Sequence, residues 1–311
     1  MANAAPPAAL CQTPIKGPIR IIVPVGAGST SDVSARLIAE KLTESLGQSF
    51  IVEDKPGGSG MLAAERLKNA TPDGTTLLLA PIAVPVLVPL VFKHVTFDPV
   101  ADFAPVAQVS RFAYAFAVRA DHPARTLSEF VVWAKSHPGQ ASFATNGVGS
   151  IPHFLGVTLN RAAGIEMVHV PYTTFATLDA DLLGGQVTAS VDALPNMIAL
   201  QRAGKIRVLA TTGAERSSLL PAVPTFKEQG FPSIEAVGWN GIFAPAGTPS
   251  PVMERLSAAV GEALRLPEIR QKLADLGLEA AGTTPEELAA IMAADTVHWA
   301  AIVKASGFTA E

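Results

Sequence analysis

Apolar residues fall in two alternating patterns along most of the chain. IRIIVPV (residues 19–25) is apolar at nearly every position, which is typical of a parallel strand that is buried on both faces. Residues 31–46 place Ala35, Ile38 and Leu42 on one face and charged side chains on the other, so they are predicted to form an amphipathic helix. Gly47 is expected to end this helix, because glycine suits the left-handed conformation of a C-cap.

The alternation of strand and helix continues in two successive parts of the sequence. Further strands are expected at FIVED (50–54) and TTLLLA (75–80), and after residue 120 at ASFAT, MVHVPY, VTASVDA and IRVLATT. Helices are expected at 61–70, 126–136, 152–163, 174–183 and 195–203. This regular alternation predicts an α/β fold of two lobes, each a mostly parallel sheet flanked by helices.

The chain is expected to cross between the two lobes twice, near residues 105–120 and 234–245. A double crossover between two α/β lobes produces a cleft with a hinge. The predicted division assigns 18–110 together with 240–311 to the first lobe, 111–239 to the second, and 1–17 to a disordered leader or the remnant of a processed N-terminus.

A strong helix start precedes the last predicted helix. Thr284 suits the N-cap, Pro285 the first helical position and Glu287 the third, as in a capping box. This helix has no sheet of its own to cover, so it is expected to pack on the first lobe.

Composition excludes several classes of protein. The 311 residues are 49% hydrophobic and 16% charged with a formal net charge of −4, which indicates a compact globular chain and no nucleic-acid partner. The apolar stretch LLLAPIAVPVLVPLVF (77–92) contains three prolines, so a membrane span is not expected there. Cys11 is the single cysteine, and the histidines show no HxxxH or HExxH spacing, so neither a disulfide nor a metal site is expected.

Two glycine- and serine-rich turns, one in each predicted lobe, are the main candidates for a binding site. IIVPVGAGSTSD (21–32) and SFATNGVGSIPH (142–153) each run from a strand into a helix. A helix N-terminus presents unpaired backbone N–H groups and partial positive charge, so each turn would bind an anion. Facing each other across the cleft, the turns would hold two ends of one anionic molecule.

Particular groups in these turns are expected to contact the ligand. Ser29 and Ser150 are the expected N-caps, and Ser29 would form a capping box with Asp32. Hydroxyls of Ser29, Thr30 and Ser150, the side chain of Asn146 and the backbone amides of three glycines are the expected donors: Gly28, Gly147 and Gly149. A purely structural capping role remains the alternative for each turn.

Residues outside the turns are also candidates. Asp192 ends the strand VTASVDA, a position that borders the ligand crevice in open α/β sheets. It would bind an ammonium or hydroxyl group of a ligand, or cap the helix that begins near Pro195. Tyr172 would line the pocket or belong to the core, and His169 is expected to be structural.

Motifs of nucleotide binding and catalysis are missing from the sequence. GAGSTS departs from GxGxxG at Ser31, no Gly-Lys-Ser/Thr follows a glycine loop, and no GxSxG nucleophile elbow occurs. An enzyme and a cofactor are therefore not expected, although a hydrolase or transferase on a two-lobed scaffold stays an alternative.

The chain resembles the substrate-binding proteins of tripartite tricarboxylate transporters, the Bug family. The resemblance runs nearly end to end, through PIRIIVPVGAGSTSDVSARLIAEKL, LGQSFIVEDKPGGSGMLAAERL, TNGVGSIPHFLG, HVPY, LDADLLGGQV, AGKIRVLATTGAERSSLLPAVPTFKEQGFP and GWNGIFAPAGTP. It implies a Venus-flytrap fold, a periplasmic location, no catalysis, and capture of a small carboxylate for a permease with one large and one small membrane subunit. A monomer is expected.

The same resemblance implies where the carboxylate binds. It assigns the first-lobe turn from Val25 to Asp32, the second-lobe turn from Thr145 to His153, and the cleft borders to Ala80-Pro81 and Asp192. A sensory protein that reports its ligand to a membrane kinase would use the same cleft and remains an alternative.

Departures from the family pattern bear on the ligand. Val25 replaces the usual aromatic residue, an apolar run follows TLLL, and Thr173-Thr174 replace the usual Lys-Gly after HVPY. An apolar wall cannot satisfy a richly hydroxylated acid, because an unpaired buried polar group costs about 1–3 kcal/mol. The expected ligand is therefore a mono- or dicarboxylate with an apolar or aromatic body, in preference to citrate.

Overall fold

The structure is a computed structural model, and it describes residue 15 and residues 17–310. Ile15 is buried against the core of the first lobe. The rest of the predicted leader, including Cys11, lies outside the described residues apart from Gly17.

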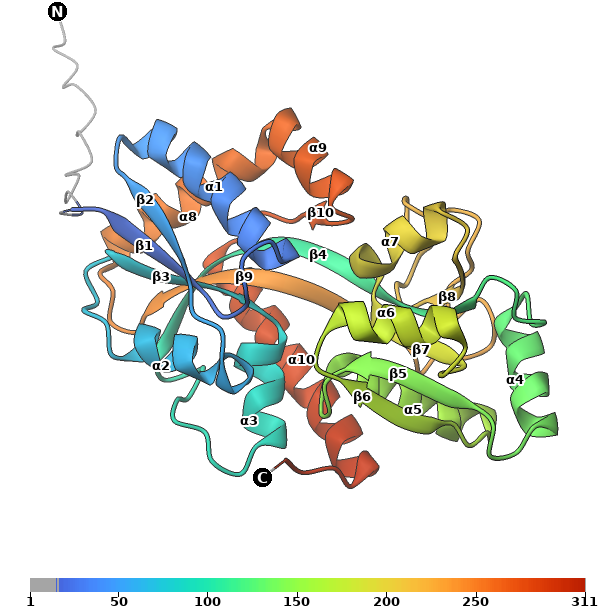
Figure 1. Ribbon diagram of the computed structural model, residues 1–311. Coiled ribbons are helices and arrows are strands. Elements are labelled where there is room, and N and C mark those ends of the chain that lie inside the picture. The colour runs from blue at the N-terminus through green and yellow to red at the C-terminus, as the bar shows by residue number, and fades with distance from the viewer. Residues whose placement is uncertain (1–14, 16, 311) are drawn as a thin grey trace, which may run out of the picture.

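Ten strands form one mixed sheet that runs through both lobes (Figure 1). They are β1 (Ile19–Val23), β2 (Phe50–Asp54), β3 (Thr76–Pro81), β4 (Phe103–Arg119), β5 (Ser142–Asn146), β6 (Val168–Tyr172), β7 (Ala189–Ala193), β8 (Ile206–Thr211), β9 (Val237–Pro245) and β10 (Glu279–Ala280). The order is β2-β1-β3-β9-β4-β7-β5-β6, with β8 and β10 paired to β4. Pairs among β1–β3 and among β5–β7 are parallel, and every antiparallel pair in the described part of the chain includes β4 or β9.

The long strands β4 and β9 carry the chain between the lobes. From Phe103 to Ala113, β4 pairs with β9, and from Tyr114 to Arg119 it pairs with β7 and β8. The change of partner at Ala113–Tyr114 therefore marks the passage between lobes. The crossings expected near 105–120 and 234–245 correspond to these two strands, and the predicted lobe boundaries fall inside them.

Helices cover both faces of the sheet (Figure 1). They are α1 (Thr30–Leu46), α2 (Met61–Lys68), α3 (Val88–Val91), α4 (Leu127–Ser136), α5 (Ile151–Ala163), α6 (Phe175–Gly184), α7 (Leu194–Arg202), α8 (Ser250–Arg265), α9 (Pro267–Asp275) and α10 (Pro285–Ser306), with short helical turns η1 (Gly58–Gly60) and η2 (Ala83–Leu87). In the first lobe α1, α8 and α9 share one hydrophobic core, and in the second lobe α6 and α7 share another. The α/β fold predicted from the alternation is confirmed.

The last helix, α10, departs from its expected packing. The predicted capping box is present, with the Glu287 amide donating to Thr284 Oγ1 and the Thr284 amide donating to the Glu287 carboxylate. A helix of 22 residues is about 33 Å long, so it extends past the first lobe. It contacts η2 and α3 on one side and α5 on the other, and thus packs on both lobes. By length and composition alone it would qualify to cross a membrane, and its buried residues are Leu288, Met292, Trp299 and Val303.

Candidate functional site

The first-lobe turn joins β1 to α1. Ser29 is the N-cap of α1, and its hydroxyl accepts a hydrogen bond of 3.2 Å from the Asp32 amide. In a complete capping box, the Asp32 carboxylate would accept a hydrogen bond from the Ser29 amide. Here Asp32 Oδ2 accepts instead from the amide of the preceding residue, Gly28, at 2.8 Å. Gly28 has a φ of 80°, which glycine adopts without strain.

Charged side chains hold this turn from behind. The Arg36 guanidinium lies 2.8 Å from Asp32 Oδ1 and 3.1 Å from Asp54 Oδ2. Burial disfavours the ionised form of Asp32, but the Gly28 amide and Arg36 outweigh burial and hold the pKa of the Asp32 carboxyl below its usual range. Burial and the Asp32 charge raise the pKa of Asp54. Asp32 is therefore an internal support of the turn and not a free ligand contact.

A buried polar network connects the start of α1 to the two crossing strands. The Ser31 hydroxyl donates to Asn240 Oδ1 of β9 at 2.8 Å, and Asn240 Nδ2 donates to the Ser110 hydroxyl of β4 at 3.1 Å. All three side chains are buried, and β4 has a bulge between Gln108 and Ser110 opposite Asn240. Sequence reasoning missed this network, because the three residues lie far apart in the chain and share no motif.

The second-lobe turn joins β5 to α5, and Ser150 is its N-cap as expected. Its hydroxyl accepts from the His153 amide at 3.3 Å and donates to the Gly147 carbonyl at 2.9 Å. Thr145 Oγ1 donates to the same carbonyl at 3.1 Å. The Ser150 hydroxyl hydrogen is thus used within the turn, and donating it to a ligand would require this hydrogen bond to break.

Two stacked histidines support the second turn. The rings of His153 and His169 are parallel, with centroids 4.0 Å apart. His153 Nδ1 accepts from the Gly149 amide at 3.2 Å, and His169 Nε2 lies 2.7 Å from Thr145 Oγ1. Because Thr145 gives its own proton to Gly147, His169 Nε2 is the donor in that contact. His153 is buried, so it supports the turn instead of contacting a ligand.

Burial lowers the pKa of both rings. The pKa of His153 lies below its usual value because the ring is buried, and burial together with the neighbouring His153 lowers the pKa of His169 to about 4. The accepting role of His153 Nδ1 also requires a neutral ring. The second turn is accordingly held by uncharged groups at neutral pH.

The three glycine amides expected to bind the ligand all have partners inside the protein. Gly28 donates to Asp32, Gly149 to His153, and Gly147 to the Tyr172 carbonyl at 3.0 Å. Different amides are free: within the described residues, no hydrogen bond is formed by the backbone N–H groups of Thr30, Ser31, Val148, Ser150 and Ile151. Free N–H groups are therefore present at the first turns of α1 and α5. They lie one residue or more from the glycines that were expected to supply them.

The remaining candidates differ in accessibility. Tyr172 donates from its hydroxyl to Asp181 at 2.7 Å, an interaction that adds to burial in raising the pKa of Tyr172 to about 12. Ala80 is fully buried, and Pro81 pairs with Asn240. Val25, Asn146 and Thr173 keep exposed surface, and Asn146 and Thr173 form no side-chain hydrogen bond in the described part of the chain.

Asp192 lies at the end of β7, opposite Ala115 of β4. Its Oδ1 accepts from the Ala193 amide at 2.6 Å and from Asn196 Nδ2 at 3.2 Å. The N-cap of α7 is Ala193, and no side chain caps this helix. Asp192 therefore does not cap α7, although its carboxylate bonds to two residues at the start of the helix.

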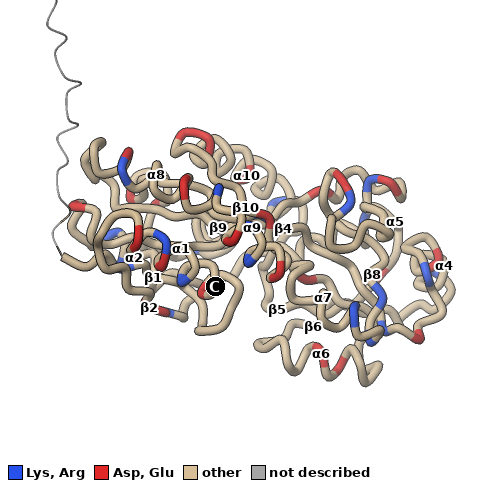
Figure 2. The backbone as a smooth tube through the Cα atoms, turned by 90° about the horizontal axis from the view of Figure 1, so that it is seen from above, with Lys and Arg blue, Asp and Glu red and all other residues tan. Residues whose placement is uncertain are grey.

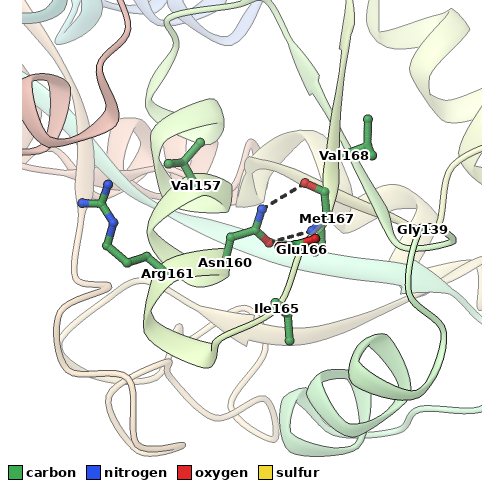
Figure 3. A pocket seen from close by; sticks show the side chains of 8 residues that line it. All are labelled: Gly139, Val157, Asn160, Arg161, Ile165, Glu166, Met167 and Val168. Carbon is green, nitrogen blue, oxygen red and sulfur yellow. Dashed lines mark hydrogen bonds between the residues drawn. The ribbon is translucent and has the colours of Figure 1, made fainter.

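Two hollows in the surface contain none of the expected residues. One of about 570 Å³ lies between α5 and β6 (Figure 3), where Asn160 uses its amide on both backbone groups of Met167 at 2.9 and 3.0 Å. A larger one of about 980 Å³ lies at the lobe junction, between α9–β10 and the segment after β8. Its wall includes Arg111, Arg216 and Arg270, and two of these are already paired, to Glu279 and Glu228.

Positive side chains do not surround the two turns. Figure 2 shows basic and acidic residues interspersed over both lobes, and between Ser142 and Leu178 the only ionised residues of the sequence are Arg161 and Glu166. Arg36, near the first turn, is paired with two carboxylates. The turns themselves would therefore hold an anion by backbone dipoles and hydroxyls.

The sequence and the fold of this chain are similar to those of known binding proteins. Residues 34–308 match the tripartite tricarboxylate transporter family receptors, TctC. Rpa4515 of R. palustris, solved with adipate, is 30% identical with a TM-score of 0.86 over 94% of this chain and 98% of its own. MatC of Rhodopseudomonas palustris, solved with malate, is 31% identical with a TM-score of 0.81 over 93% and 99%. The periplasmic binding protein BugD is 30% identical with a TM-score of 0.82 over 95% and 99%.

Two α/β lobes joined by crossing strands, with a helix N-terminus presented by each lobe, define a solute-binding protein. The family and these structural neighbours are solute-binding proteins and not enzymes. The chain belongs to the TctC family, as the resemblance predicted, and this family comprises periplasmic receptors of tripartite tricarboxylate transporters.

Proposed function

We propose that this protein captures a small carboxylate between its lobes in the periplasm, as a monomer, and delivers it to the large and small membrane subunits of a tripartite tricarboxylate transporter. The observation that carries the proposal is the pair of free helix N-termini. Thr30 and Ser31 in the first lobe, and Ser150 and Ile151 in the second, have unbonded backbone N–H groups. Such groups bind carboxylates, because each donates along the positive end of a helix dipole.

The placement of the turns supports a shared ligand. Figure 1 shows α1 beginning on the side of the first lobe that faces the second, and β5 and β6 ending on the side of the second lobe that faces the first. Ser29 and Thr30 would supply hydroxyls to one end of the ligand, and Asn146 and Thr173 would supply polar groups to the other. Val25 and Pro81 would contact its body.

The preferred ligand is a mono- or dicarboxylate with an apolar or aromatic body. Neither turn contains a lysine or an arginine, and Val25 and Pro81, which keep partly exposed surface, are apolar. Hydroxyl groups on the ligand body would lose water without gaining partners there, which costs about 1–3 kcal/mol for each group.

Thermal unfolding with a panel of acids tests this proposal. Adipate and benzoate are expected to stabilise the protein, by about 2.7 kcal/mol for an acid present at one hundred times its dissociation constant. Citrate is expected to give a smaller shift at equal concentration. A strong shift with citrate and none with the other acids would contradict the proposed ligand class, and no shift with any acid would contradict carboxylate capture itself.

A further inference from the structure

Asp192 is a buried carboxyl without a charged partner. The residue is 7% exposed and lies where β7 ends, next to the point at which β4 passes between the lobes. Oδ1 is occupied by the Ala193 amide and by Asn196. Oδ2 forms no hydrogen bond within residues 17–310, and no lysine, arginine or histidine in that range forms an ion pair with it.

The groups that face Asp192 do not favour its ionised form. Asp179 approaches from α6 and adds negative charge, and Tyr114 approaches from β4 as a neutral phenol whose pKa is itself raised by burial and by Asp192. Burial raises the pKa of the Asp192 carboxyl to about 7, against the lowering effect of the Ala193 amide and Asn196. A carboxyl in such a setting is a hydrogen-bond donor as well as an acceptor.

We infer that Asp192 determines which ligands the interlobe site accepts, by keeping a proton on Oδ2 and donating it in a hydrogen bond to an oxygen of the bound acid. The inference rests on the proposed function, since it needs a carboxylate between the lobes. It also distinguishes the roles considered for this residue: in its protonated state Asp192 pairs with a carboxylate oxygen and offers no charge to an ammonium group. At a pH where that state predominates, the site is therefore expected to select carboxylic acids over amino acids of the same length.

Binding of the acid is coupled to this proton. A second negative charge beside Asp192 favours the protonated form further, so the complex holds the proton more tightly than the free protein does. Where free Asp192 is ionised, each unit rise in pH weakens binding by up to about tenfold. His153 and His169 do not contribute in this range, because burial keeps both rings neutral.

Calorimetric titration with adipate at about pH 6.5 and about pH 8.5 tests the inference. In the unaltered protein, the dissociation constant is expected to rise about tenfold or more at the higher pH, with uptake of a proton that is measured by comparing two buffers. Asp192→Asn is expected to bind equally at both values without proton uptake, because its amide donates where the protonated acid did. Asp179→Asn, which removes a nearby carboxylate on α6, is the matched control: it is expected to keep the proton uptake and the weaker binding at high pH, with the change beginning at a lower pH because one cause of the raised Asp192 pKa is gone.

Three results separate failure of this inference from failure of the proposed function. Adipate binding that is equal at both pH values, with Asp192→Asn no different, would overturn the role of Asp192 and leave carboxylate capture intact. If succinate or adipate bound no better than aspartate in the unaltered protein, the selection against ammonium would be wrong. No binding of any acid at either pH would overturn the proposed function instead.

Discussion

The two turns present similar helix N-termini but are held in place by different chemistry. The first turn is fixed by ions and a long-range polar network, through Asp32, Arg36 and the Ser31–Asn240–Ser110 contacts. The second is fixed by neutral groups, through Ser150, Thr145 and two stacked histidines, with Phe308 against His153. The comparison shows that backbone amides can be held in position for an anion by either ionic or neutral side chains. Different substitutions and pH changes should therefore disturb the two turns.

Asn240→Ala is expected to have the largest effect, on the first turn only. It leaves the Ser31 and Ser110 hydroxyls unpaired in a buried site and creates a cavity, so unfolding free energy should fall by about 2–4 kcal/mol. Hydrogen exchange should quicken at the hydrogen-bonded amides of Gly28 and Asp32 and stay unchanged at those of Gly149 and His153.

Ser110→Ala is the graded control for this change, since it removes one hydrogen bond of the network and should cost about 1 kcal/mol. Equal acceleration of exchange in both turns of Asn240→Ala would mean that the turns share their support, contrary to the comparison above.

Gly149→Ala should have the next largest effect, on the second turn. Gly149 has a φ of 71°, and an added Cβ would lie 2.7 Å from the Phe308 ring, so the change is expected to cost about 1–3 kcal/mol of stability. Chemical denaturation measures the loss.

Gly147→Ala provides the matched control. Its φ of 95° also lies in the region that strains an L side chain, but nothing lies within 4 Å of the added atom, so its cost should be smaller. An equal loss for the two variants would show that Phe308 does not pack on the turn.

Acidification should affect the turns differently. The pKa of His169 falls from 6.5 to about 4 on folding, so the unfolded chain takes up the proton first and stability falls as pH drops through that interval. Asp32 has a lowered pKa, so its contribution is complete above its ordinary value of 3.8 and is lost only at lower pH.

Melting temperatures between about pH 6.5 and about pH 4.5 measure this difference. His169→Gln keeps a donor toward Thr145 but cannot be protonated, so its melting temperature should fall less steeply than that of the unaltered protein. Asp32→Asn should lower the melting temperature throughout the range without changing the slope. A steeper fall in His169→Gln would contradict the neutral state of the ring.

Sequence patterns were sufficient for the fold and for the location of the turns. Apolar runs and caps are local signals, so the β–α alternation, the Ser29 and Ser150 N-caps and the Thr284 capping box are all present as predicted. The packing of α10 on both lobes was not predicted, because its partners on α5 lie more than a hundred residues away in the chain.

The bonding of individual site groups could not be predicted from sequence. Gly28 and Gly149 were expected to offer free amides, but Asp32 and His153, each four residues further along, accept those hydrogen bonds. A side chain at that spacing can fold back onto the turn, and the sequence does not show whether it does. The role of Asn240 could not be predicted for a different reason: its hydrogen-bond partners, Ser31 and Ser110, belong to two other elements, α1 and β4.

The central claim is that one acid spans both turns, and the structure of the protein with adipate tests it most directly. One carboxylate is expected within hydrogen-bond distance of the Thr30 and Ser31 amides, and the other end of the molecule at the Ser150 and Ile151 amides. Adipate bound to a single lobe, or in the hollow lined by Arg111 and Arg270, would contradict the claim.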